Sequence, residues 1–235
     1  MEQRKVKNKS WFIIIGSFIM LVGIGLISYD YLSNKKIKKQ EQQALDNFYS
    51  EFEKNSLKEK VSNNFNEEQI IEDYQEKINY IAVLKIPKIN LERGLVNPTS
   101  YSNNINYNLE WLNGSSMPDE ENGNVIIAGH SGNARISYFR NLDKLIIGDE
   151  ITLLYNNQTY KYQVIDIYEE IKDGNIEIRK EKDETTITLI TCKYNTNYQI
   201  VVIGKLIWKG DIWIKVLKIL KYLESQDIQL CVPII

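Results

Sequence analysis

Hydrophobic and polar positions divide the chain into parts with different periods. The first part, residues 10–31, is almost uninterrupted apolar sequence, and no charged residue lies between Ser10 and Tyr29. About 20 such residues, at ~1.5 Å rise per residue, cross the ~30 Å hydrocarbon core of a bilayer. The run continues into Tyr29-Asp-Tyr-Leu-Ser-Asn34 without the small-residue cleavage site of a signal peptide. We therefore predict an uncleaved transmembrane anchor over residues 10–31.

The second part, residues 32–79, is a charged stretch rich in Lys, Glu, Gln and Asn, without Pro or Gly. Its apolar residues recur at helical spacing, and they are Leu45, Phe48, Phe52, Ile70, Tyr74 and Ile78. This pattern predicts one or two amphipathic helices, interrupted near Ser62-Asn-Asn64. Such a stalk is either a helix that packs on the globular part and regulates it or a solvated spacer. We favour the spacer, with at least its last turns docked.

From Tyr80 to Trp208 the period becomes that of β-strands, and these residues form the predicted globular domain, 80–208. The strand candidates are 81–86, 89–96, 124–128, 150–155, 159–167, 185–191 and 199–208. Asn156-Asn157 marks a hairpin turn, and only Ser137–Lys144 indicates a helical turn. Seven or eight short strands with few helices predict an all-β domain in the form of a closed or nearly closed β-barrel.

The last part, residues 209–235, is a basic amphipathic tail. Lys215, Lys218 and Lys221 share one face of a predicted helix, with Trp213 and Leu217 on another. Such a helix either lies on a membrane surface or caps the barrel, and the sequence leaves both open. Cys231 follows it without a nearby histidine, so we assign this thiol no catalytic role.

Charge and composition exclude several function classes. The formal net charge is −2, which gives no indication of nucleic-acid binding. Four basic residues precede the apolar run and four follow it, and the first group lies closer to the membrane, which weakly favours a cytoplasmic N-terminus for residues 1–9. Two cysteines provide no disulfide framework. The acidic turn 117–123 lacks the ligand spacing of an EF-hand, and we predict no metal and no cofactor.

Candidate chemistry lies at the ends of two predicted strands. His130, the single histidine, follows the apolar run 124–129, and Cys192 ends the run 186–192. A thiol with a pKa near ~8.5 and an imidazole near ~6.5 can exchange one proton around neutral pH. Such a pair is the minimum equipment for thiolate catalysis. The alternative is a buried cysteine that acts as a small hydrophobe and a histidine that is only hydrogen-bonded at the surface.

Several motifs in this region, taken in chain order, resemble the sortases, the membrane-anchored cysteine transpeptidases of Gram-positive bacteria. The motifs are Ile86-Pro87-Lys-Ile-Asn-Leu, Ala128-Gly-His130, Phe139-Arg-Asn-Leu-Asp-Lys-Leu145 followed by Gly148-Asp149, and Thr188-Leu-Ile-Thr-Cys192. The resemblance implies an eight-stranded sortase-like β-barrel behind the membrane anchor and the helical stalk. No aromatic D-P lid precedes His130, where Asn97-Pro98 is the nearest dipeptide, so we expect a class A-like or unassigned subgroup.

The resemblance also implies a reaction. Cys192 would attack the Thr carbonyl of an LPXTG-like sorting signal and form a thioester, while His130 would protonate the departing amine. An amine of peptidoglycan or its lipid-linked precursor would then take over the protein. The catalytic domain would have to be extracellular, which agrees with a single-pass membrane protein whose N-terminus is cytoplasmic.

One position departs from the family pattern. Family members usually carry an Arg on the strand after the cysteine, and the matching position here is Gln199. Loss of a charge-assisted bond to the oxyanion costs on the order of 10²–10³ in rate if nothing replaces it. Three alternatives remain. Gln199 serves as a neutral donor, or the protein is a weak or inactive module that only binds sorting signals or wall precursors. In the third alternative another cation reaches the site, and the candidates are Arg135, Arg140, Arg179 and Lys193. A further alternative is a tethered peptidase that hydrolyses instead of transferring.

Overall fold

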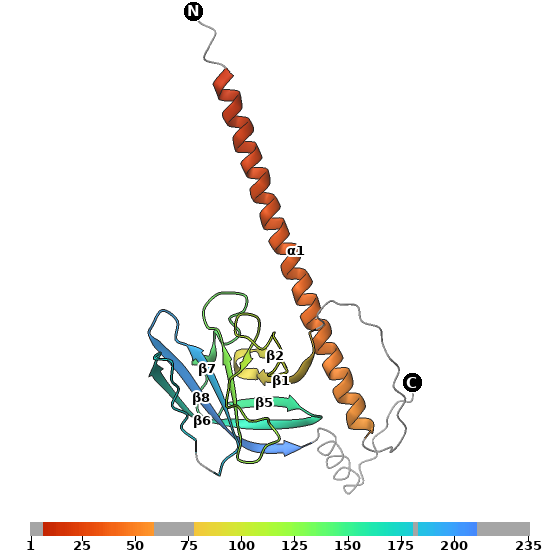
Figure 1. Cartoon of the computed structure of the whole chain (residues 1–235), viewed down its shortest axis with the longest axis vertical. Helices are drawn as coiled ribbons and strands as arrows, with labels where there is room; N and C mark the ends of the chain where they lie inside the picture. The colour runs from red at the N-terminus through yellow and green to blue at the C-terminus, as the bar shows by residue number, and fades with distance from the viewer. Residues whose placement is uncertain (1–6, 59–77, 181–182, 211–235) are drawn as a thin grey trace, which may run out of the picture. The chain divides into compact units, whose positions relative to one another are not determined.

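The computed structural model describes residues 7–58, 78–180 and 183–210 (Figure 1). Several predictions fall outside these ranges: the interruption near residues 62–64, the amphipathic positions Ile70 and Tyr74, and the tail from residue 211 with Cys231. They stay predictions.

The N-terminal region is a single helix, α1 (Lys7–Lys58). It contains the predicted anchor and continues into the predicted stalk. Residues 13–54 are long and apolar enough to include a membrane span, and the apolar window of that helix is not buried. The large side chains of this window, such as Ile13 and Phe18, are exposed. An exposed apolar surface of this length is what a lipid-facing helix requires.

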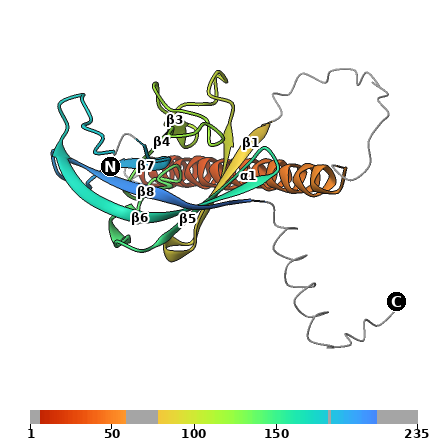
Figure 2. The same ribbon diagram turned by 90° about the horizontal axis from the view of Figure 1, so that it is seen from below.

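The globular part is one eight-stranded sheet that curves into a nearly closed barrel (Figure 2). The strand order is β2-β1-β5-β6-β8-β7-β4-β3. The strands are β1 (Tyr80–Ile86), β2 (Leu91–Val96), β3 (Glu110–Trp111), β4 (Asn124–Gly129), β5 (Glu150–Tyr155), β6 (Gln158–Ile171), β7 (Thr186–Cys192) and β8 (Tyr198–Gly210). Within this sheet β4 and β7 run parallel, and the other neighbours are antiparallel. The predicted eight-stranded β-barrel is confirmed.

Details of the elements differ from the prediction in three places. β3 is only two residues long, too short to show a period in the sequence. The strand predicted from Ile89 begins at Leu91, because Pro87–Ile89 forms a 3-10 turn that Asn90 ends in the left-handed conformation, with φ 56°. The helical turn predicted over Ser137–Lys144 is reduced to a 3-10 turn, η2 (Leu142–Lys144).

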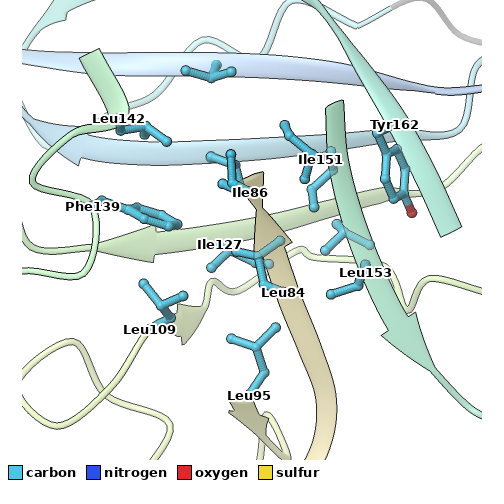
Figure 3. Packing of buried hydrophobic residues seen from close by; sticks show 14 of the residues in the cluster. Leu84, Ile86, Leu95, Leu109, Ile127, Phe139, Leu142, Ile151, Leu153 and Tyr162 are labelled. Atoms are coloured by element: carbon cyan, nitrogen blue, oxygen red, sulfur yellow. The ribbon is translucent and has the colours of Figure 1, made fainter. Parts of the chain in front are cut away.

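The strands near the predicted site are buried on both faces. The inward side chains form the barrel core, in which Leu84, Ile127 and Leu153 converge from different strands (Figure 3). The outward side chains of β4, β6, β7 and β8 form a second cluster, here called the outer cluster: Ile126, Tyr168, Ile190, Val201 and Ile203. Burial on both faces gives β4 and β7 near-continuous apolar sequences and fixes their position.

Part of helix α1, from Leu45 onward, belongs to the same compact unit as the sheet. Phe48 and Phe52 are buried, and the Tyr49 hydroxyl donates a hydrogen bond to Glu92 on β2 at 2.5 Å. The Lys85 ammonium lies 4.9 Å from the centre of the Tyr49 ring. Burial, followed by the hydrogen bond to Glu92, raises the pKa of Tyr49. The stalk therefore packs on the domain at this first set of helically spaced apolar residues.

Candidate active site

The pairing of β4 with β7 brings the two predicted reactive residues to the same edge of the sheet. Asn124 pairs with Thr186, and the register runs without a shift to Gly129 and Thr191. His130 and Cys192 are the next residues of these two chains. The separation of 62 residues between them is the same as the register offset of the strand pair. Because neighbouring strands lie about 4.7–4.9 Å apart, we infer from this register that the backbones of His130 and Cys192 lie close together.

Cys192 differs from the rest of its strand in exposure. The first six residues of β7 are buried, whereas Cys192 is exposed and carries a free thiol. A cysteine that only filled the core would be buried like its neighbours. Exposure at the end of a rigid strand leaves the sulfur accessible to a substrate.

Threonine hydroxyls fix the register of this strand pair at both ends. At the site end, Thr191 Oγ1 donates to the carbonyl of Gly129 at 2.8 Å. At the other end, the hydroxyls of Thr186 and Thr188 both donate to Asn124 Oδ1 at 3.0 Å. All three threonines are buried, and their hydroxyls are satisfied by these bonds. A slip of the register would break all of them.

Gly129 connects the histidine motif to the Phe139 motif. A Cβ at position 129 would lie 2.5 Å from Leu109 Cδ2 and 2.7 Å from Phe139 Cδ2, so a side chain does not fit there. The amide of Phe139 donates to the carbonyl of His130 at 3.0 Å. The two motifs noticed separately in the sequence thus form one packed unit that positions His130.

A small pocket adjoins Cys192. Its lining comes from the ends of β4 and β7, the η2 region and β8, and comprises Ser131, Phe139, Arg140, Asp143, Thr191, Cys192, Lys193, Tyr194 and Ile200. Of the cations considered as replacements for the family's arginine, Arg140 and Lys193 line this pocket. Lys193 is paired with Glu169, with Nζ–Oε distances of 2.6 and 2.9 Å.

The guanidinium of Arg140 is partly occupied by backbone acceptors. Its Nε donates to the Ser137 carbonyl at 3.1 Å, and Nη2 donates to the Ala134 carbonyl at 2.8 Å. Arg179 lies elsewhere, stacked 4.0 Å from the centre of the Tyr168 ring. Arg135 is not part of the pocket lining.

Gln199 lies on the other side of Cys192, on β8. Its register partners are Cys192 on β7 and Glu170 on β6. Its side-chain nitrogen donates to Glu170 Oε2 at 3.3 Å and to the Asn175 carbonyl at 3.1 Å. Cys192 and Gln199 are thus paired on the adjacent strands β7 and β8, and His130 directly follows β4 at the same edge of the sheet. The structure adds Glu170 and Asn175, which no sequence motif indicated.

No group of three or more His, Cys, Asp or Glu side chains within residues 7–58, 78–180 and 183–210 is arranged to hold a metal ion.

A sequence model described as the sortase domain matches residues 84–207, which is more than half of the chain. The chain belongs to the sortase family. Sortases are transpeptidases that act on sorting signals and cell-wall acceptors, and they are commonly associated with membranes. The family resemblance seen in the sequence is confirmed.

Individual relatives agree with this assignment. Sortase D of Bacillus subtilis (strain 168) is 29% identical over 111 residues, which cover 47% of this chain and 53% of the relative. This sortase thus spans about half the length of that curated relative. The solved structure of the Clostridium perfringens Sortase D5 transpeptidase matches with a TM-score of 0.53 and 25% identity, over 72% of this chain and 99% of that one. Sortase A from Corynebacterium diphtheriae matches with a TM-score of 0.50 and 26% identity, over 57% and 67% of the two chains.

Proposed function

We propose that this sortase is an active cysteine transpeptidase with Cys192 as the nucleophile and His130 as the general acid and base. The observation that carries the proposal is an exposed free thiol at the end of β7, beside the end of the parallel strand β4, which the single histidine of the chain directly follows. Exposure gives the thiol access to a peptide, and the strand pairing gives it a proton acceptor.

The reaction divides into two balanced steps. In the first, His130 takes the proton of the Cys192 thiol, and the sulfur attacks the Thr carbonyl carbon of an LPXTG-like sorting signal. The C–N bond breaks, a thioester forms, and the imidazolium returns its proton to the departing amine. In the second, an amine of peptidoglycan or its precursor attacks the thioester, its proton passes to His130, and the thiolate leaves. The imidazolium then returns this proton to the thiolate, so the histidine and the thiol both end as they began.

The proposal includes a location. Helix α1 would anchor the protein in the lipid bilayer as a single pass, with residues 1–9 on the cytoplasmic side and the barrel outside the cell. The substrate protein and the wall precursor both meet the enzyme on that outer surface. The exposed apolar helix supports the anchor, and the side of the membrane follows from the location of the substrates.

A transfer assay tests the reaction. The full-length chain in detergent micelles would be incubated with a panel of LPXTG-type peptides, with and without an amine acceptor, beside a Cys192→Ala variant. Acceptor-dependent product, absent in the variant, is the expected result. Cleavage without transfer would indicate a tethered peptidase instead. Equal behaviour of both proteins across the panel, with retained peptide binding, would indicate a non-catalytic binding module.

A further inference from the structure

The side-chain amide of Gln199 has no hydrogen left to give. Its nitrogen carries two, and they are donated to Glu170 Oε2 and to the Asn175 carbonyl. Both partners can only accept, because one is a carboxylate and the other a backbone carbonyl. Rotating the amide by half a turn would set its oxygen against two other oxygens, so the hydrogen-bond chemistry fixes the orientation. Donation to an oxyanion on Cys192 would require one of these bonds to break.

The same bonds hold a segment of the chain that follows β6. Glu170 Oε2 also accepts a hydrogen bond from the amide of Glu177 at 3.3 Å. Gln199 binds the segment two residues earlier, at Asn175. Glu170 on β6 and Gln199 on β8, two neighbouring strands, thus both form hydrogen bonds with residues 175–177.

Tyr168 fastens the next residues of this segment. Its hydroxyl donates a hydrogen bond to the carbonyl of Glu177 and accepts one from the amide of Arg179 at 3.4 Å. The Arg179 guanidinium lies 4.0 Å from the centre of the Tyr168 ring. Residues 175–179 are here called the strap. Tyr168 holds its far end, while Gln199 and Glu170 hold the end nearer to Cys192.

The strap covers part of the outer cluster. Ile176 and Ile178 are partly buried and pack against that cluster, which includes Ile190 on β7 and Val201 on β8. Ile190 lies two residues before Cys192, and Val201 lies two residues after Gln199, so their side chains are on the faces of these strands that adjoin the thiol and the amide. The strap therefore covers apolar side chains on the faces of β7 and β8 that also carry the thiol and the amide.

We infer that Gln199 is a positioning residue: it ties the strap to β8 beside Cys192, and so acts on peptide binding rather than as a donor to the oxyanion. The inference rests on the proposed cysteine chemistry for its kinetic consequence alone. The consequence for the strap follows from the hydrogen bonds and needs no turnover. A donor lost from the oxyanion lowers kcat, whereas a displaced binding wall raises KM for the peptide.

The experiment compares the full-length chain with Gln199→Ala in detergent micelles by amide hydrogen exchange and by peptide kinetics. Without the amide, the exchange of the strap amides is expected to accelerate about tenfold, since two hydrogen bonds of modest net strength are lost. KM for the peptide is expected to rise about tenfold, with kcat within threefold of wild type. A kcat at least 100-fold lower, with unchanged KM and unchanged strap exchange, would overturn the inference.

Two further variants distinguish the specific hydrogen bonds that Gln199 and Glu170 make to the strap from a general loss of stability. Gln199→Glu places a second carboxylate against Glu170, so it should release the strap at least as strongly as Gln199→Ala. Glu170→Gln keeps an oxygen that accepts from Gln199 and from the Glu177 amide, so strap exchange should stay within threefold of wild type. Equal amide hydrogen exchange of the strap in Gln199→Glu and in wild type would contradict the inference that Gln199 holds the strap.

The exchange readout also distinguishes this inference from the proposed function. If wild type shows no Cys192-dependent turnover, the transpeptidase proposal fails. Amide hydrogen exchange of the strap in the Gln199 variants still decides whether Gln199 holds the strap to β8.

Discussion

The two neighbours of Cys192 are held in opposite ways. On the β4 side, the imidazole of His130 makes no side-chain hydrogen bond within the described residues, and only the backbone around it is fixed, through Gly129 and Phe139. On the β8 side, the amide of Gln199 is fully engaged by Glu170 and Asn175. His130 directly follows the end of β4, and Gln199 is the register partner of Cys192 on β8. The difference shows that the bonds a side chain makes, and not its place beside the nucleophile, decide whether it is available for chemistry.

The largest expected effect comes from replacing His130, on the β4 side of Cys192. His130→Ala should lower kcat for acyl transfer by about 10²–10⁴-fold, because general acid–base catalysis contributes that much. The free energy of unfolding should change by less than ~0.5 kcal/mol, since the ring is not part of the bonded framework. Steady-state kinetics and urea unfolding check the two statements. A large loss of stability together with the loss of rate would mean that the imidazole is a structural group.

The second prediction concerns the replacement of Gln199 by arginine, the residue expected at this position from the resemblance to the family. The buried Oε1 of Glu170 has no hydrogen-bond partner within the described residues. A guanidinium at position 199 would engage both carboxylate oxygens as a fork. Gln199→Arg alone should therefore leave kcat within about threefold of wild type.

The matching double variant releases that cation. Gln199→Arg combined with Glu170→Gln removes the carboxylate, and kcat should rise by about 10-fold to 100-fold over Gln199→Arg alone, as expected for a gained charged donor. Single-turnover acylation rates measure this step directly. Equal rates in the single and double variants would show that Glu170 does not hold the guanidinium.

The third prediction concerns the framework beneath His130. Gly129→Ala should lower the free energy of unfolding by about 1–3 kcal/mol, because the new methyl group overlaps Leu109 and Phe139. Urea unfolding measures the loss. Adding Phe139→Ala removes the Cγ and Cδ2 atoms that crowd the methyl group, so the two substitutions should cost less together than the sum of their separate costs. Strict additivity would exclude this contact as the cause.

The smallest expected effect lies away from the site, where α1 packs on β2. Tyr49→Phe removes the hydroxyl that donates to Glu92, at a cost of about 0.5–1.5 kcal/mol of unfolding free energy. Tyr101→Phe is the matched control, because among the described residues that exposed hydroxyl pairs only with Tyr107, and we expect a change below ~0.5 kcal/mol. An equal change in both variants would contradict a stabilising contact at Tyr49.

The packing of Tyr49 also has a pH dependence with a definite sign. Because burial and Glu92 raise the pKa of Tyr49 in the folded protein, its contribution to stability is fully present below the ordinary tyrosine pKa of ~10. The contribution is lost as the pH rises above that value. The difference in stability between wild type and Tyr49→Phe should therefore shrink in alkaline solution, and urea unfolding at several pH values measures it.

Much of the fold could be predicted from the sequence because β4, β7 and β8 are buried on both faces and bounded by turns, so their positions are visible as apolar runs. His130 and Cys192 could be found because each ends such a run. Glu170 and Asn175 could not, since they meet Gln199 across 29 and 24 residues and carry no local pattern. β3 could not be predicted for a different reason, because a strand of two residues is too short to show an alternation of apolar and polar positions.

The parallel pairing of β4 with β7 has a consequence for when the protein becomes reactive. Parallel neighbours cannot be joined by a tight hairpin, and here the chain builds β5 and β6 between them. His130 and Cys192 are thus 62 residues apart along an extended chain, and the pairing of β4 with β7 brings them to the same edge. Under the proposed mechanism, folding of the domain would be the activating event, because only the folded sheet supplies the Cys192 thiol with its base.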